Sequence, residues 1–166
     1  MAVTDELAAA ILDPSAALAL QVPVRWKDRP GTVRAQMSVH NVRAFPLFVG
    51  MQVTKDRPWK PTVYLMYENE QLRRLDVNGT HTNRTAGGEQ WRSRTHKHRW
   101  SEAHRDAVAY TPADIPTVPW NDVTGRNLRD VFEAFLGECH IEMRGAYSWS
   151  DPTLVSITTG RLGVAE

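Results

Sequence analysis

The sequence predicts an α+β fold: an antiparallel sheet of five to seven strands, with an N-terminal helix and one C-terminal amphipathic helix packed on one face. Two observations support this prediction. Between residues 22 and 110, short runs of alternating apolar and polar residues are separated by Pro, Gly and Asn, a pattern typical of strands and turns. Near the C-terminus, apolar residues recur at helical spacing, at positions 128, 131, 132, 135 and 136.

The chain of 166 residues, 42% of them hydrophobic, is long enough to bury its own core. We therefore expect a single domain over 1–166, with a core over about residues 20–147 and fraying of residues 159–166. The single cysteine, Cys139, excludes an internal disulfide framework and is expected to be buried rather than nucleophilic. The acidic first residues and the absence of a run of about 18 apolar residues predict a cytoplasmic protein with no membrane partner.

The first half of the chain predicts one helix and three strands. Thr4 is a suitable N-cap for a short helix that ends at Asp13-Pro14. Residues 15–20 fit either a further helical turn or the start of a strand. Strands are expected over 22–27, 33–39 and 45–54, with a turn at 29–31 and a bulge at Gly50.

The second half predicts four more strands and the clearest helix. Residues 55–61 form a loop because they contain two prolines, and strands follow over 62–67, 72–77, 94–100 and 107–110. Turns are expected at Asn78-Gly79 and at residues 86–88, a break at 101–105, and an irregular crossing at 111–120. The helix is capped by Asp122 or Thr124 and stops at Gly137. Edge strands are expected over 141–147 and 154–158, and an edge strand such as 154–158 could extend a sheet across a homodimer.

Positive charge and histidine concentrate between residues 71 and 110. This stretch holds four of the six histidines, and residues 73–105 carry eight Lys or Arg against three acids, in a chain whose net charge is only +1. A basic patch of this kind favours binding to phosphate groups, which respond to local rather than total charge.

His96 and His98 are the sharpest candidates for chemistry. On a strand, residues two apart project to the same face, so the two imidazoles would form half of a metal site or an acid and base pair. Asp76 and His81 lie at and beyond the end of the preceding strand, where Asp76 could orient an imidazole. The alternative is that the Asp and Asn side chains, including Asn78 and Asn83, only bond the local backbone in Asx-turns.

Arginines and tryptophans alternate around the histidines. Arginine forms paired hydrogen bonds with phosphate, and indole stacks on bases; the alternative is a solvated sheet face with its tryptophans in the core. Regular alternation would place Arg92 and Arg94 beside His96 and His98 on one face, which is expected to form an open groove receptive to phosphate. The candidate binding residues are Arg74, Asn78, Arg92, Arg94, Arg99 and Trp100.

Residues 70–141 resemble a family of uncharacterised proteins from bacterial genomes and mobile elements. The matching pattern is a Leu-Asp-x-Asn-Gly turn, a His and an Asn, a His-x-His strand, an acidic pair and a C-terminal helix. The chain departs from it at Ala103 and Arg105, where the family has glycines, and at Val108, where it has tryptophan. The resemblance implies a phage, prophage or defence setting and no particular reaction. The matching residues are Leu75, Asp76, Asn78, Gly79, His81, Asn83, His96, His98, Trp100, Glu102, Asp106, Ala109, Phe135, Leu136, Cys139 and Ile141.

Three functions remain open from the sequence. The first is a defence, counter-defence or antitoxin-like binding protein that recognises a nucleotide, a nucleic acid or a partner protein and needs no cofactor. The second is a small metal-independent RNase-like toxin, with His96 and His98 as acid and base, Asp76 and His81 in support, and an arginine that stabilises the transition state. The third is a metal-dependent enzyme in which His96, His98 and Glu102, or His81 or Asp106, bind a divalent metal.

Overall fold

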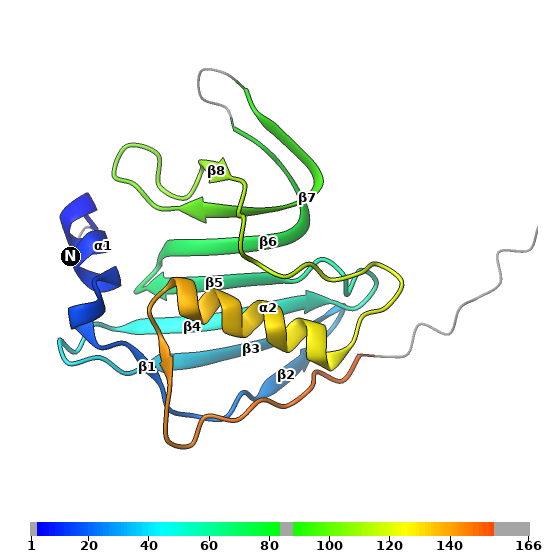
Figure 1. The fold of residues 1–166 in the computed structure, drawn as a ribbon, viewed down its shortest axis with the longest axis horizontal. Coiled ribbons are helices and arrows are strands. Elements are labelled where there is room, and N and C mark those ends of the chain that lie inside the picture. The colour runs from blue at the N-terminus through cyan, green and yellow to red at the C-terminus, as the bar shows by residue number, and fades with distance from the viewer. Residues whose placement is uncertain (1–2, 84–87, 155–166) are drawn as a thin grey trace, which may run out of the picture.

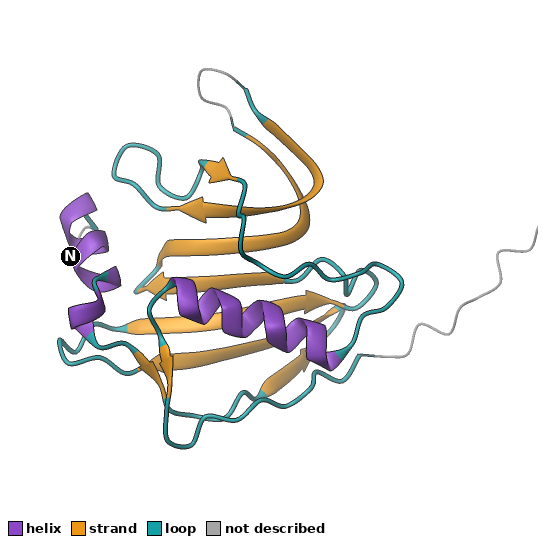
Figure 2. Cartoon of the chain, viewed as in Figure 1, coloured by secondary structure: helices purple, strands orange, loops and turns teal. Residues whose placement is uncertain are grey.

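The computed structural model describes residues 3–83 and 88–154, and it has the predicted α+β fold (Figure 1). Seven antiparallel strands form one sheet in the order β2-β3-β4-β5-β6-β7-β8. Their bounds are Trp26–Arg29, Thr32–Val39, Leu47–Thr54, Thr62–Tyr67, Glu70–Thr82, Gln90–Arg99 and Ala109–Tyr110. A small parallel pair joins β1 (Ala19–Leu20) to β9 (Glu142–Met143). The helices are α1 (Asp5–Leu12), a 3-10 turn (Pro14–Ala16) and α2 (Gly125–Glu138), as Figure 2 shows.

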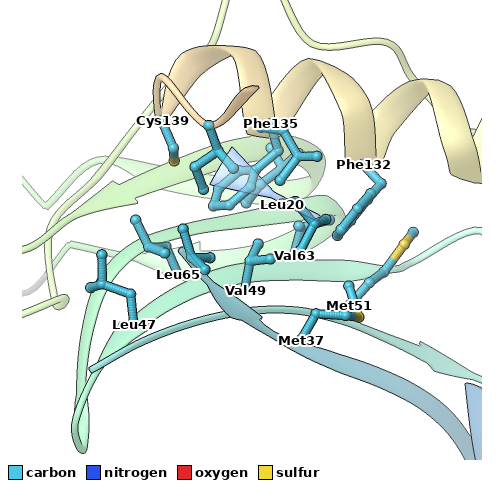
Figure 3. Packing of buried hydrophobic residues seen from close by; sticks show 14 of the residues in the cluster. Leu20, Met37, Leu47, Val49, Met51, Val63, Leu65, Phe132, Phe135 and Cys139 are labelled. Carbon is cyan, nitrogen blue, oxygen red and sulfur yellow. The ribbon is translucent and has the colours of Figure 1, made fainter. Parts of the chain in front are cut away.

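The main core lies between α2 and one face of the sheet. Phe132 and Phe135 point from α2 onto apolar side chains such as Val49 and Val63 (Figure 3). In β3, buried apolar residues alternate with polar ones that face away from α2, which is the period-two pattern of a sheet covered on one side. The sheet therefore has a covered face and an opposite face, and we call the latter the open face.

The N-terminal segment adds to the core more than the sequence predicted. Thr4 caps α1 as expected, since its side chain accepts a hydrogen bond from the N–H of Leu7. Val3 and Ile11 are buried in the main core cluster, so the core begins well before residue 20. Neither α-helix of the described residues is long and apolar enough to cross a membrane.

The strands β3, β4 and β5 closely follow the predicted ranges, but two details differ. The expected strand at residue 22 begins only at Trp26, and Val22 is exposed. Gly50 is not a bulge, because β4 pairs in regular register with both of its neighbours there. The glycine is needed for another reason: a Cβ at this position would collide with the hydroxyl of Tyr64.

The prediction of a turn at Asn78-Gly79 is wrong. Strand β6 continues through these residues, and the register with β7 shifts on both sides of Gly79. Asn78 and Ser93 adopt φ values of 50°, so each strand carries an irregular residue that increases the local bend. The β6–β7 hairpin consequently bends away from the rest of the sheet (Figure 1). Most of the predicted turn at 86–88 lies outside the described residues.

The C-terminal helix begins as predicted and ends later. Thr124 and Asn127 form a reciprocal capping box. Gly137 lies inside α2 instead of ending it, and His140 takes the left-handed conformation beyond the cap, with φ of 54°. Of the predicted strand over 141–147, only Glu142–Met143 forms, paired with β1. The predicted strand over 154–158 and the expected fraying of 159–166 fall almost wholly outside the described residues.

Candidate metal centre

Three histidines meet on the open face of the bent hairpin. His96 and His98 come from β7 and His81 from the end of β6, and one ring nitrogen from each lies within 4.8 Å of the others. The ring centroids of His81 and His98 are 4.6 Å apart, and those of His96 and His98 are 5.1 Å apart. The structure thus brings together the three histidines and Asp76, as the sequence suggested.

The irregular residues of β6 and β7 bring His81 and Trp91 into this cluster. Regular alternation would put Trp91 and His96, five residues apart, on opposite faces. The irregular residue Ser93 between them reverses this, so that their rings lie 5.8 Å apart on the same side. His96 and His98 are fully buried. The prediction that these imidazoles line a solvent-exposed groove beside Arg92 and Arg94 is therefore wrong.

Each histidine donates one ring N–H to a nearby oxygen. The Nδ1 atoms of His96 and His98 lie 2.8 Å and 2.7 Å from the carbonyl oxygens of Arg94 and Asp106. The Nε2 atom of His81 lies 3.0 Å from both the Asn83 Oδ1 and the Ala107 carbonyl oxygen. Carbonyls only accept hydrogen bonds, so these nitrogens carry the protons. In the neutral rings, His96 Nε2, His98 Nε2 and His81 Nδ1 are then acceptors, and His98 Nε2 accepts a hydrogen bond from Arg74 Nη2 at 2.8 Å.

A carboxylate faces two of these three nitrogens. Asp76 Oδ2 lies 3.5 Å from His96 Nε2 and 3.4 Å from His98 Nε2, longer than ordinary hydrogen bonds. Within the described part of the chain, the buried His96 Nε2 has no hydrogen-bond partner. Acceptor nitrogens converging on a carboxylate oxygen form a site that a cation would satisfy.

The surroundings shift the pKa values of Asp76 and His81. Burial acts to raise the pKa of Asp76, but His96, His98, Arg74 and Thr62 outweigh it and hold that pKa below its usual value. Partial burial and the neighbouring His98 lower the pKa of His81. Asp76 is therefore ionised and His81 neutral near pH 7, which are the forms that bind metal.

Arg74 is the counter-charge of the centre. Its guanidinium lies 3.0 Å from Asp76 Oδ2, 2.6 Å from Asp106 Oδ2 and 2.8 Å from His98 Nε2. Two carboxylates around one guanidinium leave an excess of negative charge beside the imidazoles.

The donor set suits a catalytic metal better than a structural one. Structural zinc sites are usually rich in cysteine and closed, whereas three histidines and an open position are typical of catalytic zinc. The observed spacing of up to 4.8 Å exceeds the edge of about 3.3 Å that Zn–N bonds of about 2.05 Å imply for a tetrahedral site. A tetrahedral zinc site would therefore require the three rings to lie closer together.

Several predicted site residues lie elsewhere. Glu102 is exposed and lies outside the cluster of three histidines, whose third member is His81. Trp100 is 3% exposed and donates its indole N–H to Glu70, so it cannot stack on a base. Arg99 is exposed, but it lies on the covered face of the sheet, where Arg73 is its cross-strand neighbour. Its guanidinium lies over the ring of Tyr110.

The two asparagines bond distant backbone rather than forming Asx-turns. Asn78 donates to the carbonyl oxygens of Trp59 and Val118, 2.8 Å away in each case. Asn83 exchanges two hydrogen bonds with the backbone of Ala109 and also holds His81. Arg92 and Arg94 are exposed, as predicted, on the outer part of the hairpin.

Arg34 was not predicted as a site residue, and Asp106 was predicted only as an alternative metal ligand. Arg34 lies on the open face, where the alternation of β3 would have placed it. The alternation of β3 was the signal that could have identified it, because Arg34 is one of the polar residues of that pattern. Cys139 is buried as predicted, and burial raises the pKa of its thiol.

Comparison with known proteins adds no relative. No protein-family model, curated protein or solved structure matches this chain. The functional argument therefore rests on the chemistry of the site.

Proposed function

We propose that the protein is a metal-dependent enzyme that binds one divalent transition metal through His81, His96 and His98, with Asp76 as a fourth ligand or as a general base. The observation that carries this proposal is the tautomer pattern. Metal-binding histidines almost always donate their second ring N–H to a carbonyl or carboxylate, and all three rings here do so. Imidazole with carboxylate suits Zn, Mn or Fe.

The substrate class follows from the charges beside the centre. Arg74 and Asp76 both line a concavity of about 390 Å³ on the open face, so a substrate there would meet a guanidinium and the edge of the metal site. A divalent metal supplies Lewis acidity and lowers the pKa of a bound water. Arg34, which lines the same concavity and forms no ion pair within the described residues, is suited to an anionic oxygen. We therefore propose hydrolysis of an anionic ester, with a phosphate ester as the first candidate.

Metal binding is the first test. Untagged protein, stripped with a chelator and reloaded, is expected to hold about one equivalent of Zn²⁺, Mn²⁺ or Fe²⁺ by elemental analysis. His81→Ala should weaken the affinity about tenfold or more. His104→Ala is the matched control, because His104 is exposed and outside the cluster. A wild-type stoichiometry near zero with every metal would refute the proposal.

Turnover is the second test. Chromogenic phosphodiesters, phosphomonoesters and neutral carboxylic esters should be compared before and after chelation. We expect turnover of an anionic ester that the chelator abolishes and the metal restores. Turnover that is insensitive to chelation would instead favour the metal-independent alternative.

The burial of His96 and His98 weighs against the RNase-like alternative. A general acid and base must reach the substrate within hydrogen-bond distance, and both rings are fully buried. A binding protein without catalysis is the second candidate, since Arg92 and Arg94 are exposed. Salt-sensitive binding with intact ligand recovered afterwards, and no turnover, would support it. A phage or mobile-element setting is proposed only from the resemblance of residues 70–141.

A further inference from the structure

Two rows of side chains cross the open face and end at the two buried histidines. Each row follows the register from strand to strand, so its members are direct cross-strand neighbours. The first row is Lys27, Arg34, Gln52, Thr62, Asp76 and His96. The second row is Gln36, Gly50, Tyr64, Arg74 and His98. The metal centre is therefore one end of a polar track that begins near the opposite edge of the sheet.

The track is hollowed along its length. A concavity of about 430 Å³ is lined by residues of β2, β3 and β4, and the concavity of about 390 Å³ beside Asp76 continues it. Arg34 and Gln52 line both. At about 4.8 Å between strands, the four steps from Lys27 to Asp76 span roughly 19 Å. A small ester would fill only the inner part.

The lining is cationic and partly fixed in place. Lys27, Arg29, Arg34 and Arg74 line the two concavities, and Asp76 is the one carboxylate among the described residues that line them. Arg34 donates from Nε to the Tyr64 hydroxyl at 2.6 Å and from Nη2 to Gln36 Oε1 at 2.7 Å. Because these two hydrogen bonds already fix the guanidinium, presenting its remaining N–H groups to an anion costs less conformational entropy.

We propose that this track binds single-stranded nucleic acid and presents a phosphodiester to the metal centre. The spaced cations suit successive phosphates. The amides of Gln36 and Gln52, which lie between them, can hydrogen-bond the edges of unpaired bases. The proposal assigns the substrate class of the proposed enzyme and rests on that function only for the chemistry, because the binding itself requires no metal.

Fluorescence anisotropy with a labelled oligo(U) of about ten nucleotides tests the binding. Arg34→Gln is expected to weaken the affinity about tenfold and to reduce the slope of log K against log salt by about 1. Arg126→Gln is the matched control, because it removes the same charge from the exposed side of α2. Lys27→Gln should act like Arg34→Gln with a smaller effect.

The outcomes separate this inference from the proposed function. Oligonucleotide binding that responds to Arg34→Gln supports the track, whether or not the protein holds a metal. A protein that binds metal and hydrolyses a small ester, but binds no oligonucleotide, would overturn the track and leave the enzyme standing. An affinity lowered by Arg94→Gln and unchanged by Arg34→Gln would move the binding to the hairpin. Equal affinity for a sulfated polysaccharide would overturn the nucleic-acid assignment.

Discussion

Gly79 controls the space around the histidines at the level of a single residue. A Cβ added here would lie 2.9 Å from His96 Cε1 and 2.9 Å from Asp76 Cβ, too close for either atom to remain in place. Because His96 is fully buried, it has little room to move. We expect Gly79→Ala to lower metal affinity about tenfold to a hundredfold, measured by competition with a metal indicator.

Gly137→Ala is the control for this substitution. Gly137 is exposed within α2, and a Cβ there meets nothing within 4 Å. It should raise the free energy of unfolding by about 0.5–1 kcal/mol and leave metal affinity unchanged. Equal metal affinities in the two variants would show that the packing of His96 does not set the geometry of the centre.

Lys97 makes stability sensitive to alkaline pH. Burial acts to lower its pKa, but Asp114 and Glu138 outweigh it and raise that pKa. Burial and Glu138 also raise the pKa of Tyr110. Both groups keep their protons to higher pH in the folded than in the unfolded chain, so their contribution to stability is present below about pH 10 and is lost above it.

Lys97→Met tests this dependence. The change leaves the carboxylate of Glu138 poorly paired and should cost about 3 kcal/mol at pH 7. Its urea-derived free energy of unfolding should then decline less than that of the wild type between about pH 9 and pH 11. A parallel decline in the two proteins would mean that Lys97 does not titrate differently on unfolding.

Among the elements, the β6–β7 hairpin is the one whose shape was hardest to predict. Asn-Gly is a strong turn signal because both residues tolerate the left-handed region. Here the same tolerance serves an irregular residue within a long strand, with Asn78 at φ of 50°. Whether Asn-Gly ends a strand or bends it depends on its distant partners, here the carbonyls of Trp59 and Val118.

Asn78 can be tested by two substitutions. Asn78→Ala loses both side-chain hydrogen bonds. It also places alanine, which tolerates positive φ less well than asparagine, at this position. Together these changes should cost about 3 kcal/mol. Asn78→Gly loses the same bonds but suits the backbone, so it should cost about 1 kcal/mol less. Urea unfolding measures both values. Equal costs would show that the backbone conformation contributes nothing.

Other elements were predictable because their signals are local. The strands β3, β4 and β5 follow from alternation, and the start of α2 follows from Thr124. The joint position of Asp76, His81, His96 and His98 was also foreseen, because a hairpin brings its two strands together. The burial of His96 and His98 was not foreseen, since it depends on the irregular residue Ser93 and on the carbonyls of Arg94 and Asp106.

At the scale of the whole molecule, the sheet separates stability from chemistry. The covered face carries the apolar core under α2, and the open face carries the polar rows and the centre. Phe132→Leu should therefore lower the free energy of unfolding by about 1–2 kcal/mol and leave metal affinity unchanged. His81→Ala should lower metal affinity and leave the free energy of unfolding of the metal-free protein nearly unchanged.

Stabilisation by metal distinguishes these two variants. Wild type and Phe132→Leu should each gain about 2.7 kcal/mol of unfolding free energy when free metal is a hundred times its dissociation constant. His81→Ala should gain much less at the same metal concentration. A loss of this gain in Phe132→Leu would show that the two faces of the sheet are coupled.

The short strand β8 has a consequence for how a metal would enter and leave. Only two residues pair it with β7, and Asn83 holds it through the backbone of Ala109. The edge strand beside His98 can therefore open locally, at far lower cost than global unfolding. Exchange of a bound metal should follow this local opening, so bound metal should slow amide hydrogen exchange at Ala109 and Tyr110 more than in β3 or β4.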